Sequence, residues 1–133
     1  MPNADALVIP HDLRIAAGLL TRFPLRFNTE VATARGARSV WAYPLVGALL
    51  GLIASVLLLA AIAVGLPAAF SAAIALLGLV VMTGALHEDG LADSADGFWG
   101  ARSPTERLRI MKDSHIGSYG VLALTGALML RWS

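Results

Sequence analysis

The longest uncharged stretch of the chain, residues 39–86, constrains the fold more than any other feature. It runs for 48 residues without a formal charge, between Arg38 and the first acidic residue that follows, Glu88. One straight helix of that length would measure about 72 Å, more than twice the roughly 30 Å hydrocarbon core of a bilayer. Residues 65–67, Gly-Leu-Pro, supply the break that such a run needs. We therefore predict a hairpin of two membrane-spanning helices, near residues 41–64 and 68–86.

The composition supports an integral membrane protein. Hydrophobic residues make up 57% of the chain and charged residues 14%, against about half and about a quarter in ordinary globular proteins. The net charge of +1 gives no indication of nucleic-acid binding, and the absence of cysteine excludes disulfides and thiolate metal sites. We predict an all-α, polytopic membrane helical bundle, with residues 1–133 forming a single membrane domain.

The residues before the hairpin mix apolar side chains with arginines. In residues 11–26 an apolar stripe at helical spacing predicts an interfacial amphipathic helix, with a short packing helix as the alternative: Leu13, Ala16, Ala17 and Leu20. Residues 27–38 form a polar connector, and Trp41 stands where an aromatic belt residue would. Residues 1–5 lack the basic start of a secretory signal, so insertion is expected to depend on the internal apolar segments.

The residues after the hairpin predict two further helices. Ser103, Pro104 and Glu106 form a capping box with proline at the first helical position, which predicts a short polar helix from Pro104 to about Ser114. Residues 116–130 are apolar for 15 residues, which is shorter than the roughly 20 that a spanning helix needs. We expect them to begin a third membrane helix and the chain to be an N-terminal fragment of a longer protein.

Four of the nine acidic residues lie in residues 87–97, HEDGLADSADG, directly after the apolar run. If the second helix continues through this stretch at about 100° per residue, Asp89, Asp93 and Asp96 share a stripe about 60° wide. Gly90 and Gly97 flank the stripe, which predicts an open shelf beside the carboxylates.

Carboxylates crowded at the end of a hydrophobic segment favour a bound cation over simple solvation. Oxygen ligands without cysteine suit Mg²⁺ or Mn²⁺, and three aspartates predict one ion or two bridging a diphosphate. The predicted catalytic aspartates are Asp89, Asp93 and Asp96, and the predicted metal ligands are these three together with Glu88. Glu88 lies about 100° off the stripe, which leaves it between ligand and solvated neighbour, and His87 lies about 160° away, which places it outside the ligand set.

Basic residues follow the acidic stretch. Two roles are open for them: they neutralise phosphate oxygens of a substrate, or they set the membrane orientation and contact lipid headgroups. These residues are Arg102, Arg107, Arg109 and Lys112.

Two long motifs, residues 87–97 and residues 109–120, RIMKDSHIGSYG, closely resemble the cobalamin synthase family, whose members are adenosylcobinamide-GDP ribazoletransferases. Residues 21–24, TRFP, and 41–47, WAYPLVG, are similar to the family's N-terminal signatures in the same order. The likeness spans most of the chain. Family members are about twice this length, which agrees with the expectation of a fragment.

The resemblance implies a Mg²⁺-dependent transferase that joins adenosylcobinamide-GDP to α-ribazole, or to its 5′-phosphate, and releases GMP in the last stage of cobalamin synthesis. It implies that the acidic motif binds metal and that the second motif, with Lys112, Asp113 and Ser114, lies near the substrate phosphates. From its place among the basic residues that follow the acidic stretch, and not from the resemblance, Arg102 is also expected to bind substrate. The implied partners are the corrinoid nucleotide, α-ribazole and the lipid bilayer of the inner membrane. Whether the protein forms a homo-oligomer stays open.

Two other classes of protein place carboxylates at a membrane. A CDP-alcohol phosphotransferase has the pattern D-x₂-D-G-x₂-A-R, whereas residues 93–102 place Arg102 one position late. An ion-coupled transporter usually holds its ion near the bilayer midplane on broken helices, whereas this stripe follows the predicted span. Both remain alternatives to the transferase.

Basic residues predict the orientation of the hairpin. They flank both of its open ends and are absent from the turn at 65–67: Arg14, Arg22, Arg26, Arg35 and Arg38 precede it, and Arg102, Arg107, Arg109 and Lys112 follow it. The positive-inside rule then places both ends, and the acidic stretch, in the cytoplasm. An accessible tag inserted at Ser103 should be labelled only after the cytoplasmic side is opened. Labelling of the tag from the periplasmic side would contradict the predicted orientation.

Overall fold

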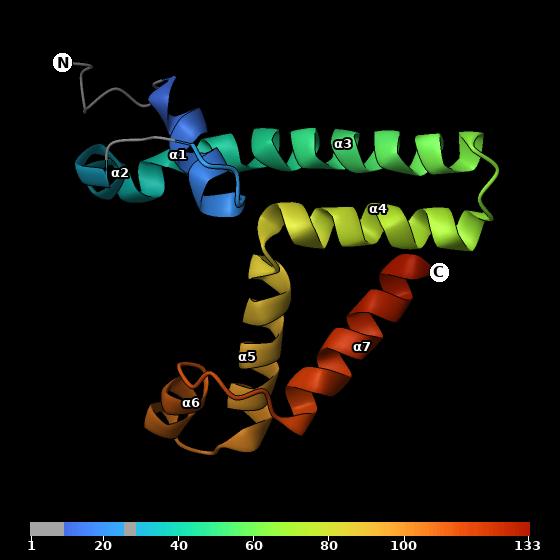
Figure 1. Cartoon of the computed structure of the whole chain (residues 1–133). Coiled ribbons are helices and arrows are strands. Elements are labelled where there is room, and N and C mark those ends of the chain that lie inside the picture. Colours follow the sequence, from blue (N-terminus) through green and yellow to red (C-terminus); the bar gives the residue numbers. More distant parts are fainter. Residues whose placement is uncertain (1–9, 26–28) are drawn as a thin grey trace.

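The computed structural model describes residues 10–25 and 29–133, and within these ranges it is entirely helical (Figure 1). The elements are α1 (His11–Leu20), α2 (Thr29–Arg35), the 3₁₀ helix η1 (Gly36–Ala42), α3 (Tyr43–Ala63), α4 (Ala68–Thr83), α5 (Leu86–Gly100), α6 (Pro104–Ile110) and α7 (Ser118–Trp132). The predicted all-α class is confirmed for the described residues. The N-terminal residues 1–5 and Arg26, used above for the signal and orientation predictions, lie outside them.

The predicted hairpin is present, because α3 and α4 lie side by side and antiparallel (Figure 1). The chain reverses at residues 64–67, where Gly65 has φ +89°, a value that side chains other than glycine rarely adopt. Pro67 precedes the first turn of α4, where its fixed φ suits a helix start. The Gly-Leu-Pro signal therefore placed the turn correctly.

The second helix ends earlier than predicted. Gly84 adopts the left-handed conformation at φ +64°, the Ala85 N–H donates to the Val80 carbonyl, and the Gly84 N–H donates to the Val81 carbonyl. This pair of hydrogen bonds is a Schellman motif, which stops a helix. Ala85 is also left-handed, at φ +60°. The prediction of one helix running straight from α4 through the acidic stretch is wrong: α5 leaves α4 at a bend of 85°.

The acidic stretch forms a helix of its own, α5. Helix α7 then packs along α5 and returns to α4, where the Trp132 indole N–H donates to the Ala69 carbonyl at 2.7 Å (Figure 1). Helix α6 packs on the far end of α5. The Ser103 hydroxyl accepts a hydrogen bond from the Glu106 N–H at 3.3 Å, which confirms the predicted cap, although α6 ends at Ile110 and not near Ser114.

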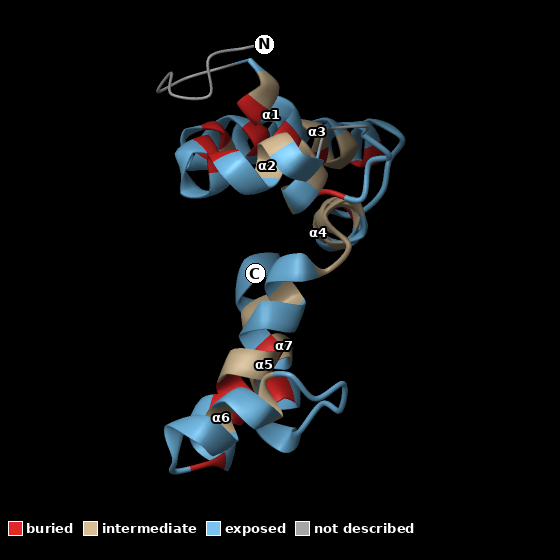
Figure 2. Cartoon of the chain, turned by 90° about the vertical axis from the view of Figure 1, so that its left-hand side faces the viewer, coloured by how far each residue is buried: buried red, intermediate tan, exposed pale blue. Residues whose placement is uncertain are grey.

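Length and apolarity suggest a membrane protein. Among the described residues, one helical stretch, Thr29–Ala63, is long and apolar enough to cross a bilayer, with a mean hydropathy of 2.8 in its best segment. Helix α4 has 16 residues, so a second span of sufficient length exists only if α4 and α5 are counted together across their bend. Large apolar side chains of α3 are exposed along its length: Leu45, Leu49, Leu52, Val56, Leu59 and Ile62. In Figure 2 the buried residues form short stretches of ribbon between longer exposed and intermediate ones.

The N-terminal helix packs against the start of the hairpin, as the alternative reading of residues 11–26 expected. Its buried residues are Asp12, Ile15 and Ala16, and Ala17 and Leu20 pack against the core at the start of the hairpin. Three of the four residues of the predicted stripe therefore face the hairpin, whereas Leu13 is exposed. Placement at a membrane interface stays a prediction. After α1, the Arg22 N–H donates to the Met82 carbonyl at 2.8 Å, which ties the N-terminal segment to the end of α4.

A fully buried ion pair holds α1 to α2. Arg35 donates from Nε and Nη2 to the two Asp12 carboxylate oxygens, at 2.9 and 2.6 Å, and the Trp41 indole donates to Asp12 Oδ2 at 2.8 Å. A bidentate guanidinium–carboxylate pair is the geometry that compensates best for removing both charges from water. Arg35 was expected in a polar connector and Trp41 in an aromatic belt, and the network that they form with Asp12 was not predicted.

Replacing one member of the buried pair should destabilise the N-terminal part strongly. Asp12→Ala or Arg35→Ala leaves an uncompensated buried charge, which costs about 3–5 kcal/mol. The double variant should cost less than the sum, because neither charge remains alone. Denaturant unfolding in detergent measures the effect. The matched control is Arg14→Ala, an exposed residue of the same helix, which should change stability by less than about 0.5 kcal/mol. If Asp12→Ala, Arg35→Ala and Arg14→Ala were all as stable as the wild type, the stabilising role of the pair would be contradicted.

Candidate functional site

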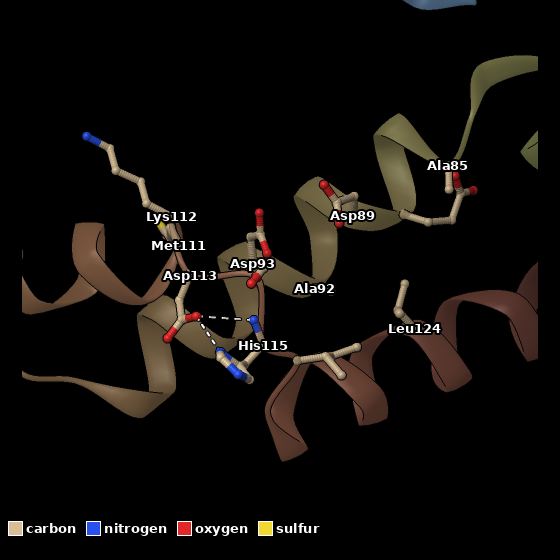
Figure 3. Close-up of a pocket in the computed structure, with 12 residues that line it drawn as sticks. Ala85, Asp89, Ala92, Asp93, Met111, Lys112, Asp113, His115 and Leu124 are labelled. Carbon is tan, nitrogen blue, oxygen red and sulfur yellow. Dashed lines mark hydrogen bonds and ion pairs between the residues drawn. The ribbon is translucent and has the colours of Figure 1, made fainter. Parts of the chain in front are cut away.

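A cleft of about 490 Å³ opens between α5, the loop at residues 111–117 and the first half of α7 (Figure 3). This volume lies within the roughly 300–1,000 Å³ typical of small-molecule sites. The polar residues that line it are Glu88, Asp89 and Asp93 of α5 and Lys112, Asp113, Ser114 and His115 of the loop. Ala92, Met111, Ile116 and Leu124 contribute apolar surface. The structure therefore brings the acidic stretch together with the residues of the second predicted motif.

Asp89 and Asp93 are the two carboxylates of α5 that face the cleft without a protein partner. They stand four residues apart on one side of the helix, as the angular argument predicted (Figure 3). In the described part of the chain neither side chain makes a hydrogen bond or an ion pair. Asp89 is exposed and Asp93 is half-buried, so both can be reached from the cleft.

Asp96, the third aspartate of the predicted stripe, has a different environment. Its side chain is buried, and its two oxygens accept hydrogen bonds from the Gly117 N–H at 2.7 Å and from the Gly120 N–H at 2.9 Å. It does not line the cleft that holds Asp89 and Asp93. Among the described residues no three acidic or histidine side chains stand where they could hold a metal ion together. Metal ligation by Asp96 stays a prediction.

Glu88 is neither simply solvated nor free. Arg131, near the end of α7, donates from Nη1 to Glu88 Oε1 at 2.7 Å, and the Glu88 side chain is only 13% exposed. The other oxygen, Oε2, is buried and has no hydrogen-bond partner in the described part of the chain. No short sequence pattern links this pair, because the two residues are 43 positions apart. A role for Glu88 as a metal ligand stays a prediction.

The loop side of the cleft contains a carboxylate–imidazole pair. The backbone N–H of His115 donates to Asp113 Oδ1 at 3.3 Å, and His115 Nδ1 lies 2.5 Å from the same oxygen (Figure 3). Hydrogen bonding to His115 lowers the pKa of Asp113 from its usual value, and the same bond raises the pKa of His115. His115 lies within the second motif, but no role was predicted for it.

The predicted basic residues do not gather in one place. Lys112 lines the cleft, with its ammonium group extended away from the aspartates (Figure 3), whereas Arg102 and Arg109 are not among the lining residues. Arg107 donates from Nε to the Ala101 carbonyl at 3.0 Å and lies over the Phe98 ring. The roles of Arg102, Asp113 and Ser114 in binding substrate stay predictions.

The glycines that flank the aspartates differ from each other. Gly90 has open space around it, as expected for a shelf. Gly97 does not: a Cβ there would stand 2.6 Å from Met111 Cγ and 3.2 Å from the Arg107 carbonyl oxygen. The expectation of open space at Gly97 is therefore wrong, because this glycine lets the end of α6 pack directly on α5.

Comparison with known proteins gives a family match over almost the whole chain. The model of the family described as cobalamin-5-phosphate synthase matches residues 12–133. The chain belongs to the cobalamin-5-phosphate synthase family. The resemblance drawn from the two motifs is thereby confirmed, and the matched range contains the cleft, the hairpin and α7.

Curated relatives agree with the family match. An adenosylcobinamide-GDP ribazoletransferase of Bradyrhizobium diazoefficiens is 45% identical over 122 residues, which is 92% of this chain and 47% of the relative. Proteins of the same name from Brucella ovis and Brucella canis are each 52% identical over 111 residues, 80% of this chain and 42% of theirs. The chain thus spans less than half the length of these relatives. No solved structure shows significant similarity to it.

The Asp113–His115 pair predicts that anion binding in the cleft depends on pH. We expect the pKa of His115 to lie above its ordinary value of about 6.5 and to fall in Asp113→Asn, because that variant loses the carboxylate that stabilises the imidazolium. Below its raised pKa His115 is cationic, so anions should bind the cleft more weakly as pH rises through that pKa.

An NMR titration of labelled histidine, assigned with His115→Gln, measures this pKa directly. Glu106→Gln is the matched control, since Glu106 is an exposed acid on the neighbouring helix and should leave the His115 titration unchanged. An identical His115 titration in the wild type and in Asp113→Asn would contradict the interaction.

Proposed function

We propose that the chain carries the acidic cleft of an adenosylcobinamide-GDP ribazoletransferase. The enzyme would join adenosylcobinamide-GDP to α-ribazole, or to its 5′-phosphate, forming adenosylcobalamin or its 5′-phosphate and releasing GMP. The observation that carries the proposal is the family match over residues 12–133, supported by relatives that bear this name at 45% and 52% identity. The chain spans 42–47% of those relatives.

A Mg²⁺ ion fits the cleft through Asp89 and Asp93. Mg²⁺ in proteins is usually held by one or two carboxylates, and water and substrate phosphate complete its coordination. Two unpartnered carboxylates one helical turn apart, facing a cleft of nucleotide size, supply such a donor set. Bound there, the ion would withdraw charge from the diphosphate and so favour attack at phosphorus.

The residues of the loop would then act on the diphosphate. In the proposed reaction the ribose hydroxyl oxygen forms a bond to the phosphorus that carries the cobinamide, and the bond from that phosphorus to the GMP oxygen breaks. The hydroxyl proton is released to water or to a carboxylate of the cleft. Lys112 and protonated His115 line the cleft opposite the aspartates and would neutralise phosphate oxygens as charge develops.

The proposed location is the inner membrane, with the cleft open to the cytoplasm. Helix α1 contacts the start of the hairpin, and α5 begins at the end of α4, so the N-terminal basic residues and the acidic helix lie at the same end of the hairpin (Figure 1). This shared end agrees with the charge-based orientation, since both predicted cytoplasmic segments meet there. Water-soluble nucleotide substrates would reach the cleft from that side.

The transferase activity is tested in membranes of a strain that lacks its own ribazoletransferase. Two proteins are supplied with adenosylcobinamide-GDP, α-ribazole and Mg²⁺: the chain itself, and the chain joined to the part of the Bradyrhizobium relative with which it does not align. Formation of cobalamin together with GMP is the expected result for at least the joined protein. If neither protein forms cobalamin while the intact relative does, the proposed function is contradicted.

The two cleft aspartates should be essential in that assay. Asp89→Asn and Asp93→Asn each keep the side-chain shape but remove a negative oxygen donor, so GMP release should fall by about 100-fold or more. Glu106→Gln removes an exposed acid outside the cleft and should keep wild-type rates. Wild-type rates in both aspartate variants would exclude the metal assignment.

A further inference from the structure

We infer that Asp96 is a positioning residue, which fastens the loop at residues 111–117 to α5 and so sets the loop opposite Asp89 and Asp93. The inference separates Asp96 from the two cleft aspartates with which its spacing groups it. It rests on the proposed function for the reaction that the loop serves. The fastening itself follows from the contacts of Asp96.

The Asp96 carboxylate caps α7 from another helix. The N-cap residue of α7 is Gly117, which has no side chain to accept the first free N–H groups of the helix. Asp96 replaces that missing cap, because Oδ2 accepts from the Gly117 N–H and Oδ1 accepts from the Gly120 N–H. A negative charge at a helix N-terminus is also stabilised by the helix dipole.

Glycine is required at both capped positions. A Cβ at Gly117 would stand 2.5 Å from Asp96 Oδ1, and a Cβ at Gly120 would overlap Oδ2 and stand 3.1 Å from the Ala92 carbonyl oxygen. Real Cβ atoms do not approach other atoms so closely. The glycine spacing at 117 and 120 therefore exists to admit this carboxylate, and it brings α7 close to α5.

The cap is what joins the loop to α5 by hydrogen bonds. In the described part of the chain, the other hydrogen bonds of residues 111–117 stay within the loop or join it to its neighbours α6 and α7. They are Met111 N–H to the Arg107 carbonyl, Lys112 N–H to the Arg109 carbonyl, Asp113 N–H to the Ile110 carbonyl, His115 N–H and Nδ1 with Asp113, and Val121 N–H to the Gly117 carbonyl. Gly117 follows His115 by two residues, so the Asp96 bond determines where the end of the loop stands relative to the cleft. Without it, the end of the loop, with His115, loses its fixed distance from the cleft aspartates, whereas Met111 still packs on Gly97 at the start of the loop.

The first test measures the cap and the metal separately, without a catalytic readout. In Asp96→Asn one acceptor oxygen becomes an N–H₂ donor, so amide exchange at Gly117 or Gly120 should speed up about tenfold, the scale of a lost cap. Gly126, in the middle of α7, is the internal control. Binding of Mn²⁺ alone, followed by electron paramagnetic resonance, should stay within about twofold in Asp96→Asn and weaken about tenfold or more in Asp89→Asn.

Two results would overturn the inference. One is an equal loss of Mn²⁺ binding in Asp96→Asn and Asp89→Asn, which would make Asp96 a ligand. The other is unchanged exchange of both glycine amides in Asp96→Asn. If Asp96→Asn does not fold, Gly120→Ala is the second variant. Its added Cβ pushes the start of α7 away from Asp96 and leaves the carboxylate itself in place. It should speed exchange at Gly117 and keep Mn²⁺ binding, and a loss of Mn²⁺ binding with unchanged Gly117 exchange would contradict the inference.

The transferase assay then links the cap to the reaction. Asp96→Asn should raise the KM for the corrinoid nucleotide while leaving the Mg²⁺ concentration needed for half-maximal rate unchanged. Asp89→Asn should change the Mg²⁺ dependence. An Asp96→Asn enzyme with a shifted Mg²⁺ dependence would contradict positioning. If the wild type itself forms no cobalamin, the proposed function fails, whereas the exchange and Mn²⁺ measurements still decide the role of Asp96.

Discussion

The arrangement of the site depends on the backbone reversal at Gly84 and Ala85. Two successive left-handed residues stop α4 and turn the chain by 85°, so the acidic helix leaves the hairpin sideways instead of extending its axis. Two left-handed residues in a row are costly when one of them is alanine, and the Schellman hydrogen bonds to Val80 and Val81 compensate part of that cost. If α4 stands upright in a bilayer, this bend directs α5 along the membrane surface. That position would expose its carboxylates to water-soluble phosphates while α7 returns toward the turn end of α4.

The acidic residues of α5 divide into two kinds by their partners. Asp96 and Glu88 fasten α7 at its two ends, through backbone N–H groups at one end and through Arg131 at the other. Asp89 and Asp93 lie between these fastenings and have no partner among the residues that the structure describes, which leaves their charge available to a ligand. Asp96 and Glu88 thus hold α7 against α5, and α7 forms one side of the cleft that Asp89 and Asp93 face. Repulsion within so acidic a helix is reduced, because half of its charges are compensated by the protein itself.

Much of the fold was predictable from local signals. The Gly-Leu-Pro turn, the Ser103 cap and the apolar run after residue 116 each act within a few residues, and the structure contains the corresponding turn and helices. Contacts between residues far apart in the sequence were not predicted. The buried Asp12–Arg35 pair, the Glu88–Arg131 pair and the contact of Gly97 with Met111 join residues that no short pattern connects. Helical periodicity grouped Asp96 with Asp89 and Asp93, because it depends only on the angle of each residue around one helix axis. It does not show which neighbouring segments pack against each turn of that helix.

The sequence by itself determined the family, the helical hairpin and the residues from which the cleft is built, because uncharged length and dense motifs are properties of contiguous residues. Only the tertiary structure decided which carboxylates face the cleft and which are used to hold it together. The physical reason is that a carboxylate's role depends on the donors within hydrogen-bond reach. Those donors, the N–H groups of Gly117 and Gly120 and the guanidinium of Arg131, come from helix α7, more than twenty residues away.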